Sequence, residues 1–157
     1  MQIRVRVMIV LLVLSAGCVA CNVSTTASID REEAQKLSDS FMSDLVNNKV
    51  AEAVNLMESG FVKSLGSKDA EATIRKLFEY CGQPKEYEFR HDEIGTRMYL
   101  DGRTKPMRKF FYVGATTMHP RGICFFAVEI VPGDNDLRVA SFGPLKVLTG
   151  KPPEWAR

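Results

Sequence analysis

His91 and Asp92 are adjacent residues whose types could carry out acid–base chemistry. A histidine oriented by a carboxylate can accept and return a proton near neutral pH. Adjacent residues of a regular strand point to opposite faces of a sheet, so the two side chains could cooperate only if a bulge reoriented one of them. His119 precedes Pro120 in an expected turn, which favours an exposed side chain. We therefore expect no catalytic residue in this chain.

The four cysteines are the other reactive side chains, and their positions give them different meanings. Cys18 and Cys21 form a C-x-x-C pair, a pattern that elsewhere indicates redox or metal chemistry. Cys81 and Cys124 fall at the end of an expected helix and at the start of an expected strand, which brings them close in space. Two interpretations stay open for Cys81 and Cys124: a disulfide, or two buried thiols that pack as small apolar side chains.

Sequence motifs of several common enzymes are absent. The chain contains no His-Glu-x-x-His, no Gly-x-Ser-x-Gly, no Ser-x-x-Lys and no glycine-rich phosphate loop. Two histidines without a neighbouring cysteine or histidine cluster give no zinc site of standard spacing. Asp134-Asn135-Asp136 resembles the start of a calcium loop but lacks its later Gly and Glu, so it is interpreted as a turn. We expect no metal and no cofactor.

The N-terminal residues have the pattern of an export signal. Arg4 and Arg6 precede the apolar run Met8–Leu14, and the small residues Ser15-Ala16-Gly17 follow it. An apolar run of this length is shorter than the ~20 residues that a membrane-spanning helix needs. The segment is therefore predicted to direct export and then to be removed.

Ser15-Ala16-Gly17-Cys18 resembles the lipobox of bacterial lipoproteins, with Ser15 where leucine is commoner. The resemblance implies that the chain is cleaved before Cys18 and that the Cys18 thiol carries a diacylglycerol anchor with fatty acids such as palmitate. A lipid-bound Cys18 could not form a redox pair with Cys21. Because Val19 is not acidic, it further implies the outer membrane, facing the periplasm, in a cell with two membranes. The alternative is an ordinary signal peptide followed by an incidental cysteine.

Composition and charge divide the remaining chain. We expect a signal peptide at 1–17, an acylated tether at 18–29, one domain at 30–148 and a tail at 149–157. The chain has 21 basic and 19 acidic side chains, and Arg4 and Arg6 lie in the signal, which leaves 19 of each. A balanced chain has no electrostatic reason to bind nucleic acid.

Basic residues are concentrated in one later stretch: Arg97, Arg103, Lys105, Arg108 and Lys109. Such a cluster could bind phosphates or anionic headgroups. The alternative, which we favour, is a solvated hairpin end whose charges keep the domain soluble.

Hydrophobic periodicity predicts helices first and strands afterwards. Three helices are expected, beginning at Asp30, at Val50 and at Asp69, with a turn at 61–65 between the last two. Gly82 and Pro84 end the third helix. Four antiparallel strands follow, over 86–100 with a bulge between His91 and Gly95, then over 107–118, 123–131 and 137–142. Helices that precede an antiparallel sheet predict an α+β fold in which a strongly bent sheet curls over the helices like a cone.

This element order, with Tyr80-Cys81-Gly82-Gln83-Pro84 before strands containing Phe111-Tyr112-Val113 and Phe125-Phe126-Ala127, resembles the nuclear-transport-factor-two-like superfamily. The alternative is a cystatin-like helix-on-sheet domain. The superfamily includes isomerase-like and dehydratase-like enzymes whose cone holds an apolar pocket. The resemblance implies candidate pocket residues here: Tyr87, Phe89, His91, Asp92 and Tyr112.

The sequence thus favours a membrane-anchored extracytoplasmic lipoprotein whose domain binds a small ligand, a peptide or another envelope protein without catalysis. Two alternatives remain: a pocket enzyme of isomerase, dehydratase or hydrolase type, and a structural subunit of the envelope. A hollow cone would favour the enzyme, whereas filling of its interior by Phe110, Phe126 and Phe142 would disfavour it.

Overall fold

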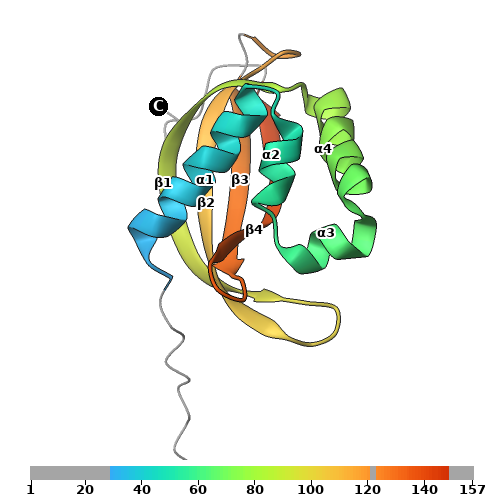
Figure 1. Cartoon of the computed structure of the whole chain (residues 1–157). Coiled ribbons are helices and arrows are strands. Elements are labelled where there is room, and N and C mark those ends of the chain that lie inside the picture. Colours follow the sequence, from blue (N-terminus) through green and yellow to red (C-terminus); the bar gives the residue numbers. More distant parts are fainter. Residues whose placement is uncertain (1–28, 121–122, 149–157) are drawn as a thin grey trace, which may run out of the picture.

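The computed structural model describes residues 29–120 and 123–148 and has four helices packed on one face of an open four-stranded antiparallel sheet (Figure 1). The sheet order β1-β2-β3-β4 follows the chain, so every connection between strands is a simple hairpin or loop. This confirms the predicted α+β, cone-like architecture. The elements are α1 (Arg31–Val46), α2 (Val50–Asn55), α3 (Ser59–Leu65), α4 (Ser67–Cys81), β1 (Pro84–Met98), β2 (Thr104–Thr116), β3 (Ile123–Pro132) and β4 (Leu137–Leu148).

Helix α1 is capped by Asp30, whose carboxylate accepts a hydrogen bond from the Glu33 backbone N–H at 2.8 Å. This cap satisfies one of the free N–H groups at the start of the helix. At the other end, the Gln83 amide donates to the carbonyl oxygens of Leu45 and Val46 at 3.0 and 3.1 Å. A residue just after α4 therefore closes the end of α1 and ties the two helices together.

The segment between α2 and α4 differs from the prediction. Residues 59–65, where a turn over 61–65 was expected, form the short helix α3, and α4 starts at Ser67 rather than at Asp69. Gly66 joins the two helices with a φ of 82°, a backbone conformation that glycine adopts without steric cost. Only Gly66 separates the end of α3 at Leu65 from the start of α4 at Ser67. The predicted end of α4 is confirmed: Gly82, with φ of 80°, is its C-cap.

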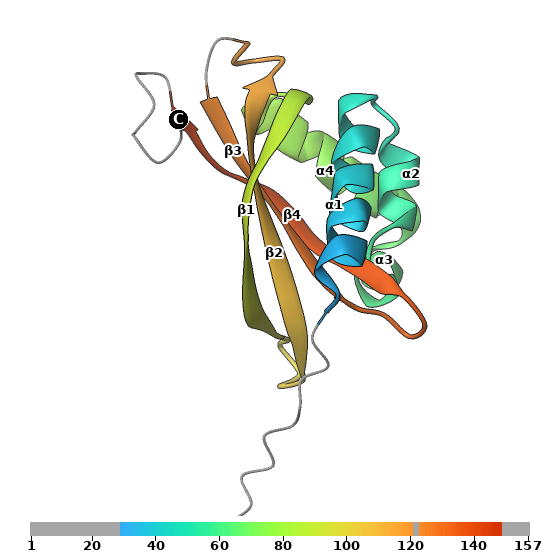
Figure 2. The same ribbon diagram turned by 90° about the vertical axis from the view of Figure 1, so that its left-hand side faces the viewer.

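Strand β1 changes the direction of its side chains at an irregularity between Phe89 and His91, slightly before the predicted bulge. Phe89 lies opposite Tyr112, whereas His91 lies opposite Phe111, so two steps along β1 match one step along β2. Phe89 and Asp92 consequently face the helices, and His91 faces the other side of the sheet. The long strands β1 and β2 twist strongly across the helix layer (Figure 2).

Strand β4 is longer than predicted. Gly143 and Pro144 do not end the pairing, because they lie opposite Ala127 and Phe126 and the ladder continues to Leu148. An irregularity between Phe125 and Phe126 accommodates the proline. The start of β4 also forms a parallel bridge with Met57, so the α2–α3 connection borders this edge of the sheet.

Large apolar side chains fill the space between the helices and the sheet. Phe41 from α1 and Phe110, Tyr112 and Phe126 from the sheet are all completely buried. The Phe41 and Phe142 rings meet edge to face with centroids 5.5 Å apart. Burying one such side chain contributes about 1.5–3 kcal/mol. The interior is therefore a packed core that holds α1 against the sheet.

The close approach of β1 to β2 at Gly114 gives a test of this register. A Cβ atom at Gly114 would lie 2.0 Å from the Glu86 carbonyl oxygen, whereas nothing lies within 4 Å of one at Gly143. We expect Gly114→Ala to lower the free energy of unfolding by at least ~2–3 kcal/mol through overpacking. Gly143→Ala should change it by less than about 1 kcal/mol. Urea denaturation of both variants measures the difference, and equal stabilities would contradict the register.

Candidate functional site

None of the sequence-predicted pocket residues lines either of the two grooves described below. Tyr112 is completely buried, and its hydroxyl lies 2.7 Å from Ser38 Oγ and 2.9 Å from Asp39 Oδ1 of α1. Tyr87 packs edge to face on Tyr112 and donates to the Asp39 carbonyl oxygen at 3.0 Å. Burial raises the pKa of both phenols, so both stay protonated near neutral pH. They fasten α1 to the sheet.

Phe89 also belongs to this packed layer. Its ring lies 6.0 Å from that of Tyr112 and 6.1 Å from that of Phe110, between centroids. Phe110 and Phe126 are completely buried, and the Phe126 ring stacks on Phe142 at 6.2 Å. Phe110, Phe126 and Phe142, the side chains expected to fill the interior if the cone is not hollow, therefore all belong to the packed core.

His91 and Asp92 lie on opposite faces of the sheet, as expected for neighbours in a strand. The exposed His91 ring stacks on Phe111 with centroids 4.5 Å apart, and its Nε2 lies 3.6 Å from Glu93 Oε1. Asp92 instead faces the helix side and pairs with Arg31 and Arg108. Because the bulge precedes both residues, it does not bring them together. They form no catalytic dyad.

Asp92 is the centre of an ion-pair network at the start of α1, in which Asp92 and Arg108 are largely buried and Arg31 is half exposed. Arg31 Nε donates to one carboxylate oxygen at 2.9 Å, and Arg108 Nη1 donates to the other. Arg108 also donates to the Ile29 carbonyl oxygen at 3.4 Å. Burial of the carboxyl opposes ionisation, but the hydrogen bonds and charges of the two arginines outweigh it and hold the pKa of Asp92 below its usual value.

The basic cluster found in the sequence is neutralised by carboxylates. Glu129 accepts from both Arg97 and Lys109, and its pKa is lowered because Ser141 and these two cations outweigh the effect of burial. The other three pairs are Arg103 with Asp101, Lys105 with Glu58, and Arg108 with Asp92. Each cation in the stretch thus already has an anionic partner. The solvated hairpin end fits this arrangement better than a phosphate-binding patch.

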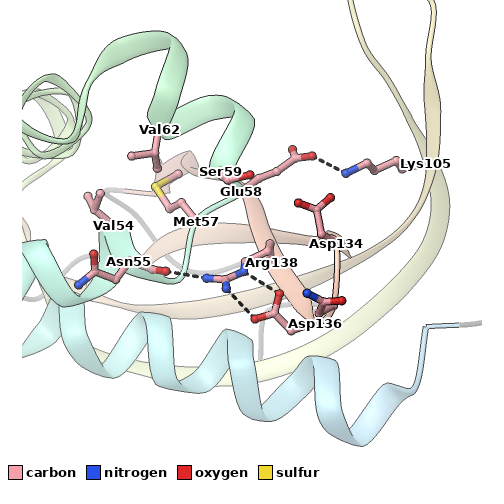
Figure 3. Close-up of a pocket in the computed structure, with 12 residues that line it drawn as sticks. Val54, Asn55, Met57, Glu58, Ser59, Val62, Lys105, Asp134, Asp136 and Arg138 are labelled. Atoms are coloured by element: carbon pink, nitrogen blue, oxygen red, sulfur yellow. Dashed lines mark hydrogen bonds and ion pairs between the residues drawn. The ribbon is translucent and has the colours of Figure 1, made fainter.

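Two adjoining grooves lie at the end of the domain where α3 begins and the β1–β2 and β3–β4 hairpins turn. Their volumes are about 380 and 560 Å³, within the range of ligand sites. The smaller groove has Val54, Met57 and Val62 on one side. Its charged side chains come from separate elements, and Figure 3 shows them arranged around the opening: Glu58, Lys105, Asp134, Asp136 and Arg138.

Glu58 connects the elements that form these grooves. Its carboxylate accepts from Lys105 Nζ at 2.6 Å and from the Tyr99 hydroxyl at 2.9 Å. Burial and the hydrogen bond to Glu58 raise the pKa of Tyr99 to about 12. Lys105 Nζ also donates to the Pro132 carbonyl oxygen at 2.9 Å. One carboxylate at the start of α3 thereby links both hairpins.

Arg138 fixes the other side of the smaller groove. Its guanidinium donates to both carboxylate oxygens of Asp136, at 2.9 and 2.6 Å, and to the Asn55 carbonyl oxygen at 2.8 Å (Figure 3). The Asp134 carboxylate is exposed at the opening between Arg138 and Lys105. The sequence interpretation singles out neither Glu58 nor Arg138. The sequence feature that comes nearest to this groove is the excess of basic residues on the hairpin that contains Lys105, the partner of Glu58.

Cys81 and Cys124 are buried free thiols in the structure. Cys81 Sγ donates to the Leu77 carbonyl oxygen at 2.9 Å, and Cys124 Sγ lies 3.9 Å from Thr116 Oγ1. Burial raises the pKa of both thiols, and the nearby Cys124 raises the pKa of Cys81 further. The structure thus contains the thiol form of this pair. Cys18 and Cys21 lie outside the described residues.

Two general features of the described residues bear on cofactors and membranes. In residues 29–120 and 123–148, no group of three or more histidine, cysteine and acidic side chains could hold a metal ion. None of the helices in those ranges is both long and apolar enough to cross a bilayer.

Comparison with known proteins gives a structural likeness at low identity. No protein-family profile matches the chain, and no curated protein matches it. Among solved structures, the chain is similar to Aln2 from a Streptomyces species, with 15% identity, coverage of 76% of this chain and 94% of that chain, and a TM-score of 0.45. A likeness of this size carries no argument about function, so the α+β description rests on the element order and pairing given above.

Low pH should destabilise the domain through Asp92. A carboxyl with a lowered native pKa stabilises the fold above its unfolded pKa of about 3.9, and this contribution is lost as the pH falls through the native pKa. We expect Asp92→Asn to lower the free energy of unfolding by ~2–3 kcal/mol at neutral pH, because Arg31 and Arg108 lose a charged acceptor. Its stability should also fall less steeply below about pH 4.

Urea denaturation at a series of pH values measures both effects of Asp92→Asn. Asp134→Asn is the matched control, because Asp134 is exposed. The control should follow the unmodified protein at every pH. An Asp92→Asn curve parallel to the unmodified one below about pH 4 would show that Asp92 does not carry this acid dependence.

Proposed function

We propose that the protein is a lipid-anchored binding module of the bacterial cell envelope. Three sequence features support the anchor: the basic start with Arg4 and Arg6, the apolar run Met8–Leu14, and Cys18 directly after small residues. Residues 22–28, Asn-Val-Ser-Thr-Thr-Ala-Ser, have the small polar composition of a flexible tether. The described domain begins directly after this stretch, at Ile29.

The observation that carries the binding function is the contrast between a filled interior and open grooves at the end of the domain. Phe110, Tyr112 and Phe126 are completely buried and pack into the space between the helices and the sheet. The smaller groove combines an apolar side with charged groups of both signs around its opening. An apolar anchor surrounded by polar groups is the arrangement found in protein–protein recognition sites. The groove therefore suits a segment of a partner protein better than a reaction.

The charges of the groove restrict what such a segment could carry. Lys105 and Arg138 are each paired with a carboxylate of the domain, whereas the Asp134 carboxylate is exposed beside them. A partner segment with an apolar side chain next to a lysine or arginine would match the apolar side and Asp134 together. We assign the smaller groove to an envelope protein that presents such a segment.

The nuclear-transport-factor-two-like superfamily is part of the same proposal. Its support is the order of helices before four antiparallel strands, together with the strong twist of the long strands over the helix layer. Function does not transfer with a fold, so the binding role rests on the groove and not on this likeness.

The anchor can be tested on two cysteines that differ by three positions. Cys18→Ser should abolish incorporation of a clickable fatty acid and leave the precursor uncleaved, because the thiol that receives the lipid is gone. Cys21→Ser is the matched control and should label as the unmodified protein does. In-gel fluorescence and intact mass measure both properties. Labelling that survives Cys18→Ser, or a mature protein without acyl mass, would refute the lipoprotein assignment.

The groove can be tested by photo-crosslinking in living cells. A benzophenone amino acid at Asn135, which lines the smaller groove, should give one discrete crosslinked product with another envelope protein. The control position is Lys76, an exposed residue of α4 away from the groove. Adding Asp134→Lys to the Asn135 probe should reduce the product several-fold, because it reverses the charge offered to the partner. Equal products from both probes, or none at Asn135, would contradict this site.

A further inference from the structure

The β1–β2 hairpin projects beyond the helix layer (Figures 1 and 2). It also carries exposed apolar side chains. Ile94, Met98 and Leu100 have relative exposures of 75, 78 and 111%. Most of the exposed large hydrophobic residues in the described part of the chain therefore lie on this one arm. Clustered exposure of this kind indicates a surface that is covered in use.

Asp92, Ile94 and Met98 lie in one row of side chains along β1, and the helices cover only the start of this row, at Asp92. Asp92 of this row contacts Arg31 in the first turn of α1. By strand alternation Ile94 and Met98 point to the same face as Asp92, opposite Arg108 and Thr104 of β2. Because α1 begins at Arg31, it does not cover the later part of the row.

The chain enters the domain beside this open row. Arg108, the cross-strand partner of Ile94, donates to the carbonyl oxygen of Ile29. Only the residues from 18 to 29 separate Cys18 from this point. A flexible segment of this length has an r.m.s. span of about 17–20 Å. The hairpin arm from Asp92 to Leu100 is itself about 26 Å long at ~3.3 Å per residue. The arm can therefore reach any bilayer to which Cys18 is attached.

We propose that the hairpin arm docks on the lipid bilayer, with Leu100 and Met98 inserted among the headgroups and upper acyl chains. This inference depends on the proposed acylation of Cys18, which determines which end of the domain faces the membrane. Tyr99 suits the same level, because tyrosines concentrate at membrane interfaces. Its ring centroid lies 5.6 Å from the guanidinium carbon of Arg97 and 5.6 Å from that of Arg103.

The apolar side chains of the hairpin arm, and not its charges, drive its insertion into the bilayer in this arrangement. Arg103 is paired with Asp101, Arg97 with Glu129 and Lys105 with Glu58, so the arm offers no excess positive charge to anionic lipid. The other occupant of the row would be the tether itself. Residues 19–28 are Val-Ala-Cys-Asn-Val-Ser-Thr-Thr-Ala-Ser, in which the valines are the only sizeable apolar side chains. The composition therefore favours the bilayer over the tether.

Spin labels on the acylated protein in vesicles test the docking. In a Cys21→Ser background, Leu100→Cys, Ile94→Cys and Met118→Cys each receive a nitroxide, while the native Cys81 and Cys124 are buried. Met118 is the matched control, an exposed methionine in the β2–β3 connection at the other end of the sheet. Collisions with oxygen and with an aqueous nickel complex are measured in phosphatidylethanolamine vesicles with and without phosphatidylglycerol.

The label at Leu100 should gain oxygen collisions and lose nickel collisions several-fold relative to Met118, with Ile94 between the two, whatever the phosphatidylglycerol content. A Leu100 label as aqueous as the Met118 label, on protein whose mass shows the acyl chains, would overturn docking and leave the anchor intact. Low collision rates with both oxygen and nickel would mean that the tether covers the row of Ile94 and Met98, which would overturn docking. Insertion that occurs only with phosphatidylglycerol would overturn the apolar mechanism. A missing acyl mass would reject the proposed function itself.

Discussion

The irregularity between Phe89 and His91 determines what each part of β1 does. Before it, Tyr87 and Phe89 face the helices and pack on Tyr112. After it, the inward position belongs to Asp92, which meets the first turn of α1, and His91 stacks on the far face with Phe111. Without this shift, a histidine would point at Arg31 and Arg108, and the aspartate would lie on the open face. A one-residue change of register thus separates the packed half of the strand from the projecting arm.

Two kinds of interaction then hold the domain together, and they differ in weight. The aromatic layer between α1 and the sheet is completely buried at Phe41, Phe110 and Tyr112, so each of these side chains contributes on the order of 2 kcal/mol or more. Most of the surface ion pairs contribute ~1 kcal/mol or less. Asp92, Glu58 and Glu129 differ from these surface pairs, because their side chains are only 12, 12 and 15% exposed and their replacement leaves partly buried cations without an acceptor.

The sequence predicts the order of elements but not the contacts that define the site. Hydrophobic periods of about 3.6 and 2 residues identify α1, α2, α4 and the four strands, and Gly82 marks the end of α4. Helix α3 is not predicted because Phe61 and Val62 belong to a segment too short for a helical period to repeat. Phe110 and Phe126, which the sequence names as side chains able to fill the interior, are buried there.

Glu58 and Arg138 could not be predicted because their partners are distant in the chain. Glu58 and Lys105 are separated by 47 positions and come within 2.6 Å only after β1 and β2 have folded back over α3. The same holds for Arg31, Asp92 and Arg108, whose contacts depend on the exact register of β1. Charge counts reveal that cations gather on one hairpin, but they cannot show that each cation already has an anion.

The two edges of the sheet are protected by different means. At the β4 edge, the Val139 backbone N–H donates to the Leu56 carbonyl oxygen and its own carbonyl accepts from the Glu58 N–H, so the ladder is occupied there. At the opposite edge, β1 pairs with β2 on its inner side, and no other described strand pairs with its outer side. Its exposed side chains include Lys85, Glu86, Glu88 and Glu93, and clustered charge of this kind deters an incoming strand. On a crowded two-dimensional surface, such an edge would keep neighbouring copies from joining their sheets into a continuous ribbon.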